Sequence, residues 1–316
     1  MMGAIVSGFR KAVAALIAIL LACALGDTAV AQTHKSPALW RVRSGDSTVY
    51  LFGSIHILPP EFVWMTPRIE QAMASADLFL FEVPVGDAAI ADERQFLLQN
   101  GILPRRQSLR GLLSPSEFDV FASVMRTAGI QAPVYERYRP WLASIVLGLA
   151  YLHPDSLAAL KGADDEVIRF AQEHGRQMTY FETPRQQLEL LTAASDSAQL
   201  RGLKNLIATL SRSRNLEQVL RESWANGEPE RLTAIIDDVF RDRREAQDFL
   251  VGRRNRLWLT TINPLLQRSG ASMITVGAAH VGGKDGLIAL ICNEGYTVER
   301  VLEDGGSTSA CAVSAQ

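Results

Sequence analysis

The chain has 316 residues, of which 47% are hydrophobic and 21% are charged. This balance is typical of a folded globular protein, and it excludes both a disordered chain and a small scaffold held together by disulfides. Removing the first 31 residues, which resemble an export signal, leaves 285 residues with 30 basic and 33 acidic side chains and a formal charge of −3. Such a charge gives no sign of nucleic-acid binding.

The N-terminal segment has the three parts of a secretory signal peptide. Arg10 and Lys11 precede an apolar run over 12–25, and a small-x-small sequence ending at Ala31 supplies a cleavage site. A helix of 14 residues rises about 21 Å, which is too short for the roughly 30 Å of a bilayer core. The sequence therefore predicts a periplasmic or secreted protein, cleaved near Ala31, with no integral membrane segment afterwards. A lipobox-like sequence ending at Cys23 leaves a lipoprotein as the alternative.

Strands are predicted near both ends of the mature chain, with helices between them. The strands are expected at 39–43, 48–52, 77–83, 272–276 and 297–302, with one more at 177–181. A first helix is expected from Thr66 and Pro67, which are an N-cap and a first-turn proline, and a last one at 286–292. The other helices are expected at 115–127, 141–152, 165–174, 184–194, 200–225 and 229–268.

This order of elements predicts an α/β fold. The mixed sheet is built from both chain ends, and a large helical insertion lies between them over about 104–268. No Pro- or Gly-rich linker divides the sequence. We therefore predict a single domain over 32–316 after the signal peptide at 1–31.

One motif follows a hydrophobic strand at each end of the chain. Residues 50–52 lead into Gly53-Ser54-Ile55-His56, and residues 274–276 lead into Gly277-Ala278-Ala279-His280. A glycine at the end of a strand lets the backbone turn and approach a ligand, and the histidine three residues later projects from the carboxyl edge of the sheet. Strand alternation also places Glu82 in one row with Leu78 and Leu80, so an apolar row ends in a carboxylate.

Two imidazoles and one carboxylate can bind a divalent metal and leave positions open for water and substrate. His56, Glu82 and His280 are therefore the candidate metal ligands. Structural alternatives exist for each, because a histidine after a strand is commonly a hydrogen-bonded loop residue and a carboxylate can pair with an arginine. Glu182 also follows a predicted strand, but it stands beside a capping box at 183–186 that marks the start of a helix.

These segments resemble the TraB/GumN family, which includes the Tiki proteins, over essentially the whole mature chain. The matching segments, in the family's order, are 39–40, 51–56, 81–82, 140–141, 162–164, 181–183, 224–227, 254–255 and 276–280. The resemblance implies a metal-dependent hydrolase acting on a peptide or protein substrate, with Mn or Co as the favoured metal and Zn or Fe as alternatives. It places His56 and His280 on the two histidines of the G-x-x-H motifs and Glu82 on the glutamate. Ser54 and Val281 depart from the family's usual Thr and Leu without changing a ligand.

The catalytic hypothesis gives proton transfer to Glu182 or to Glu82 itself, and gives Arg254 the binding of a substrate carboxylate or oxyanion. The alternative for Arg254 is a solvated helix face, which its many charged neighbours favour. Asp164 is interpreted as an N-cap, because apolar residues at helical spacing follow it. His34 and His153 have no partner that the sequence identifies.

A second hypothesis is a non-catalytic exported protein that binds haem, a metal or a peptide at the same histidines, and a third is a scaffolding member of the family. Cys292 and Cys311 are the cysteines left after signal removal. They either form a disulfide between the C-terminal tail and the last helix or remain free thiols. The sequence does not indicate an oligomeric state.

Overall fold

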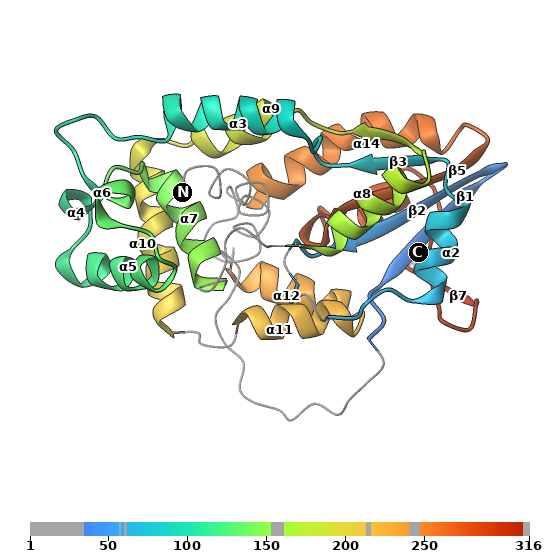
Figure 1. The fold of residues 1–316 in the computed structure, drawn as a ribbon. Coiled ribbons are helices and arrows are strands. Elements are labelled where there is room, and N and C mark those ends of the chain that lie inside the picture. Colours follow the sequence, from blue (N-terminus) through green and yellow to red (C-terminus); the bar gives the residue numbers. More distant parts are fainter. Residues whose placement is uncertain are drawn as a thin grey trace. The chain divides into compact units, whose positions relative to one another are not determined.

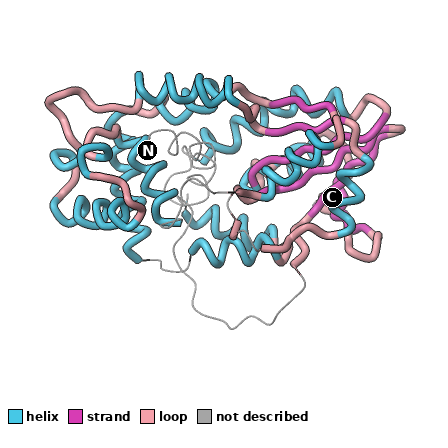
Figure 2. Tube along the Cα trace, viewed as in Figure 1, coloured by secondary structure: helices cyan, strands magenta, loops and turns pink. Residues whose placement is uncertain are grey.

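The structure is a computed structural model that describes residues 35–56, 58–59, 62–152, 161–212, 216–239 and 247–311. These residues form one mixed sheet with helices between its strands, as Figures 1 and 2 show, which confirms the predicted fold class. The predicted signal peptide, Cys23, His34 and His153 lie outside the described residues. Across the part of the chain that is described, no helix combines the length and apolar character that crossing a bilayer requires.

The described residues group into two compact units. One takes its residues from 83–160 and 182–217 and is built from helices. The other takes its residues from 35–82, 161–181 and 218–311 and holds the sheet. The prediction of a single domain over 32–316 stays a prediction.

The sheet is drawn in magenta in Figure 2, and its described strands have the order β4-β3-β5-β2-β1-β6-β7. They run over Leu39–Ser44 (β1), Ser47–Ser54 (β2), Leu78–Phe81 (β3), Gln177–Tyr180 (β4), Gly270–Gly277 (β5), Val298–Val301 (β6) and Ser307–Ser309 (β7). From β4 to β2 neighbouring strands are parallel, whereas β1, β6 and β7 join antiparallel. β2 and β5 pair with Ser54 opposite Gly277. The two G-x-x-H motifs therefore begin side by side, although they come from opposite ends of the chain.

Helices cover both faces of the sheet. Those next to it run over Pro67–Ser75 (α2), Ala163–Glu173 (α8), Arg253–Leu265 (α14) and Leu287–Asn293 (α15). Phe79 on β3 belongs to the hydrophobic cluster with α2 and α8, and its neighbour Leu80 belongs to the cluster with α14 and α15. On β2, Phe52 and Leu51 divide in the same way. Central parallel strands are thus apolar on both sides, as burial between two helical layers requires.

The helical unit packs around α7, whose side chains are almost all buried. Its helices run over Asp87–Asn100 (α3), Leu109–Leu112 (α4), Pro115–Thr127 (α5), Ala132–Tyr135 (α6), Pro140–Leu152 (α7), Pro184–Thr192 (α9) and Asp196–Arg212 (α10). α7 contacts α5 and α10, and α3 contacts α9. Further elements are Leu216–Ala225 (α11), Pro229–Val239 (α12), the π-helical turn Asp248–Gly252 (η1) and the 3-10 turn Ala278–His280 (η2).

Several described elements were not predicted: the short helices α4 and α6, the turn η2, the helix α3 and the strand β7. α3 was not predicted, because it begins after Gly86 instead of a Ser, Thr, Asp or Asn cap, and its sequence has no regular apolar stripe. β7 was also missed, because it is three exposed polar residues that the predicted pattern of apolar alternation does not cover. The helix predicted at 200–225 corresponds to α10 and α11, between which residues 213–215 are not described. The helix predicted at 229–268 corresponds to α12, η1 and α14, and residues 240–246 after α12 are not described.

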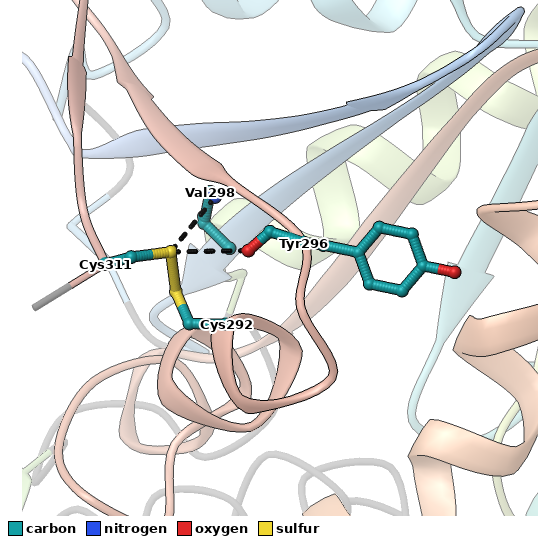
Figure 3. The surroundings of a disulfide bond; sticks show 4 residues. All are labelled: Cys292, Tyr296, Val298 and Cys311. Atoms are coloured by element: carbon teal, nitrogen blue, oxygen red, sulfur yellow. Dashed lines mark hydrogen bonds between the residues drawn. A yellow bond between two sulfur atoms is a disulfide. The ribbon is translucent and has the colours of Figure 1, made fainter. Parts of the chain in front are cut away.

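A disulfide joins Cys292 and Cys311, whose Cα atoms lie 5.7 Å apart (Figure 3). Of the two sequence alternatives, the structure has the bonded one. The Sγ atom of Cys311 lies 3.3 Å from the backbone nitrogen of Val298, and the neighbouring Ala310 donates its N–H to the Val298 carbonyl. The bond therefore fastens the C-terminal segment to α15 and to β6.

We expect reduction of this disulfide to lower the free energy of unfolding by about 3 kcal/mol, because a crosslink between residues 19 positions apart restricts the unfolded chain. Thermal unfolding with and without reductant measures the effect. The double variant Cys292→Ser/Cys311→Ser is the control and should not respond to reductant. An unchanged melting temperature of the unmodified protein in reductant would contradict the structural role of the bond.

Candidate functional site

Three of the predicted site residues follow three neighbouring parallel strands. Glu82 follows β3, His280 ends the η2 turn after β5, and His56 follows β2, while the strand order is β3-β5-β2. Because parallel strands end at the same edge of a sheet, these side chains meet there. Leu78 and Leu80 belong to the cluster on the α14 side, and Glu82 meets a residue of α14, so the predicted row of side chains holds.

The carboxylate of Glu82 is buried, with 8% of the residue exposed, and both of its oxygens accept hydrogen bonds. Oε1 accepts from the backbone N–H of Gly277 at 2.7 Å, and Oε2 accepts from Nη2 of Arg254 at 2.7 Å. Burial alone would raise the pKa of Glu82. The positive charge of Arg254 and the two nearby histidines outweigh it and lower the pKa to about 2, so the group is a carboxylate at neutral pH.

His280 has a fixed tautomer. Its Nδ1 lies 2.7 Å from Oδ1 of Asn255, whose Nδ2 donates to the carbonyls of His280 and Asp285 at 3.0 and 2.7 Å. Since the amide oxygen can only accept, Nδ1 carries the hydrogen and Nε2 carries the lone pair. Nη1 of Arg254 donates to Nε2 at 3.0 Å. Burial, followed by the charge of Arg254, lowers the pKa of His280 to about 3, so the ring is neutral at pH 7.

His56 has a carboxylate as its partner. Nδ1 lies 3.0 Å from Oδ2 of Asp164, whereas Nε2 is buried with no hydrogen-bond partner among the described residues. Burial would lower the pKa of His56, but the charge and hydrogen bond of Asp164 raise it to about 8. A Cβ atom built on Gly277 would lie 3.1 Å from Nε2 of His56 and 3.2 Å from Oε1 of Glu82. Because Gly277 has no side chain, the ring of His56 and the carboxylate of Glu82 can both lie against its backbone.

Asp164 is not the N-cap that the sequence predicted. The helix α8 is capped at Gly162, whose N–H donates to the Asp165 carboxylate at 2.6 Å, and Asp164 lies in the first turn with its side chain at His56. Gly162 packs so closely that a Cβ atom there would lie 2.5 Å from the backbone of His56. The segment 162–164 therefore holds the start of α8 against the His56 loop, and this contact delivers the carboxylate to the ring.

Arg254 is buried, with 2% of the residue exposed, so the alternative of a solvated helix face is wrong at this position. Besides Glu82 and His280, its guanidinium contacts the Leu250 carbonyl at 3.3 Å and lies 4.8 Å from the ring centre of Trp258. His280 lies 4.5 Å from the same ring. The side chain points toward Glu82 and His280, and its positive charge is paired with the carboxylate of Glu82.

The other arginines of this part of α14 do follow the charged-face prediction. The side chains of Arg253 and Arg256 are 62% and 45% exposed and pair with Asp248. Asp248 begins the π-helical turn η1, which ends at Gly252, two residues before Arg254. Single π-helical turns within helices are frequent at functional sites.

Glu182 follows β4 and belongs to the helical unit. The predicted capping box beside it is present, because the hydroxyl of Thr183 accepts from the N–H of Gln186 and the Gln186 side chain accepts from the N–H of Thr183. The role of Glu182 in proton transfer stays a prediction.

The chemistry of the donor set fits a divalent metal. His56 and His280 each have Nδ1 held by a second residue, Asp164 or Asn255, which is the arrangement that orients imidazole ligands in metal sites. Nε2 of His56 is buried and has no hydrogen-bond partner in the part of the chain that the structure describes, and Nε2 of His280 lies 4.0 Å from Oε1 of Glu82. These three atoms are of the types that Mn, Co, Zn and Fe bind.

One feature of the arrangement opposes a metal. Arg254 already binds both Glu82 and His280, and within the described ranges no three side chains of His, Cys, Asp or Glu converge as a ready-made metal cluster. A cation bound to these ligands would lie next to the positively charged guanidinium of Arg254.

The fold and this centre define an α/β protein with a largely enclosed His–Glu–His group at the carboxyl edge of a mixed sheet. Comparison with family models matches residues 38–300 to the TraB/PrgY/gumN family, and the chain belongs to this family. No curated protein and no solved structure matches the chain significantly.

We expect Asp164→Asn to lower the pKa of His56 from about 8, because the carboxylate favours the charged ring and the amide does not. NMR titration of the ring carbons measures this pKa. Asp46→Asn, in the turn between β1 and β2, is the control and should leave the titration unchanged. The same His56 pKa in Asp164→Asn and in the unmodified protein would show that the contact does not control the ring.

Proposed function

We propose that this protein is an exported hydrolase that uses a divalent cation to cleave peptide-like substrates. The observation that carries the proposal is the buried Nε2 of His56, which lies beside the carboxylate of Glu82 and has no hydrogen-bond partner among the residues that the structure describes. A buried polar atom without a hydrogen-bond partner is rare and calls for an ion, a water or a ligand. Family membership supports the proposal, and a periplasmic or secreted location is part of it.

His56, Glu82 and His280 would hold the cation through Nε2, a carboxylate oxygen and Nε2. Asp164 and Asn255 keep Nδ1 of the two rings engaged, so each ring in its neutral form has its lone pair on Nε2. His56, whose pKa is about 8, loses its second proton when it binds the cation. When bound, a divalent cation polarises a substrate carbonyl and lowers the pKa of water. Mn or Co is the expected metal, with Zn or Fe as alternatives.

Proton transfer is not assigned to Glu82. A group with a pKa of about 2 is a weak base at neutral pH, and its anionic form is better suited to holding a cation. Of the two glutamates that the sequence offers as a base, Glu182 therefore remains. Glu182 directly precedes Thr183, the N-cap of α9, and its substitution tests whether it transfers a proton.

The unpartnered nitrogen of His56 also supports a second candidate function, in which haem, a metal or a peptide binds without being turned over. The two candidates require the same ring and differ in what happens to the bound molecule. They are separated by product formation and by visible absorption.

We expect the purified mature protein to bind Mn²⁺ or Co²⁺ and to cleave a peptide library only when the metal is present. His56→Ala and His280→Ala should lose both properties, because each removes one ligand. Metal content by mass spectrometry and cleavage by peptide sequencing measure them. His174→Ala is the control, since this exposed ring at the end of α8 bonds the Phe170 carbonyl and stacks on the Phe170 ring, away from the three candidate ligands.

Equal metal content in His56→Ala and in the unmodified protein would remove His56 as a ligand. Full cleavage in the presence of a chelator would contradict metal dependence. Metal or haem binding without cleavage would instead support the binding protein.

A further inference from the structure

We infer that Arg254 is a built-in competitor of the metal: its guanidinium and a divalent cation occupy His280 in mutually exclusive states. The inference rests on the proposed function, because it concerns the same ligands. It goes further because it gives Arg254 the control of cation binding. This role replaces the earlier hypothesis that Arg254 binds a carboxylate or oxyanion of the substrate.

The first step of the argument is the geometry of the guanidinium. Arg254 bridges the centre, with Nη2 2.7 Å from Oε2 of Glu82 and Nη1 3.0 Å from Nε2 of His280. Nε2 of His280 lies 4.0 Å from Oε1 of Glu82. The positive charge of the arginine thus touches two of the three atoms that a cation would need.

The second step is the valence of the imidazole nitrogen. Asn255 fixes the hydrogen of His280 on Nδ1, so Nε2 has a single lone pair. That lone pair accepts the N–H of Arg254, and it cannot bind a metal at the same time. Glu82 does not impose this choice, because each carboxylate oxygen has more than one lone pair.

The third step is burial. Arg254 is 2% exposed and has Trp258 and the Leu250 carbonyl as further partners. A guanidinium and a divalent cation within a few ångströms in such a place repel each other strongly. The arginine also has a purpose without metal, because it neutralises the buried carboxylate of Glu82 and keeps both ligands in place.

The consequence is a centre with two states. In the described state Arg254 takes the place of a cation, and in the second state it has released His280. The apparent metal affinity is reduced by the fraction of molecules in which His280 is released. A minor state of this kind is commonly populated at about 0.1–10%, so removing the competitor should tighten binding by about tenfold or more.

Titration with Co²⁺, followed by calorimetry and by visible absorption, tests the inference on the whole mature chain. Arg254→Met keeps an unbranched side chain but removes the guanidinium, and it should bind Co²⁺ about tenfold tighter or more. Arg254→Lys keeps the charge beside Glu82, should fold even if the Met variant does not, and should also bind tighter because the two-pronged contact is lost. Arg256→Met, on the exposed face of the same helix, is the matched control and should bind like the unmodified protein.

Unchanged or weaker Co²⁺ binding in both Arg254 variants, with binding by the unmodified protein, would overturn the inference and leave the proposed function standing. Absence of Co²⁺ binding in the unmodified protein and in both variants would overturn both.

Discussion

The carboxylate of Glu82 is the group on which the centre depends. It joins the end of β3 to the end of β5 through the N–H of Gly277, and to α14 through Arg254. A buried carboxylate costs several kcal/mol unless it is paired and hydrogen-bonded, and here both oxygens are satisfied. Because β3, β5 and α14 meet at this carboxylate, its hydrogen bonds also fix the positions at which the loops after β3 and β5 begin.

The two G-x-x-H motifs give their histidines opposite environments. For His56 the charge of Asp164 outweighs burial and raises the pKa to about 8, whereas for His280 burial and then the cationic Arg254 lower the pKa to about 3. The motif itself sets only the position of each ring after a strand. The chemistry of the ring is set by residues that come from α8 and α14, far away in the sequence. Similar motifs thus supply one ring that tends to be charged and one that stays neutral.

Much of this arrangement could be predicted from the sequence, because it follows from strands. The hydrophobic runs before His56 and His280 indicated strands, parallel strands end at one edge, and alternation placed Glu82 beside that edge. The partners could not be predicted in the same way. The sequence hypothesis gave Arg254 a role in binding substrate, but local spacing does not reveal that this arginine pairs with Glu82 and His280 of the protein itself. Asp164 looked like a helix cap because its tertiary contact with His56 leaves no periodic signal; only its place in a family segment could have indicated it.

The central claim is that His56, Glu82 and His280 form a single cation centre at the edge of the sheet. A crystal structure of the mature protein grown with Co²⁺, with the metal located by anomalous scattering, tests it most directly. The account predicts one peak at about 2.0–2.2 Å from Nε2 of both rings and from a carboxylate oxygen of Glu82. A peak bound elsewhere, or electron density that places the two rings in separate parts of the molecule, would contradict it.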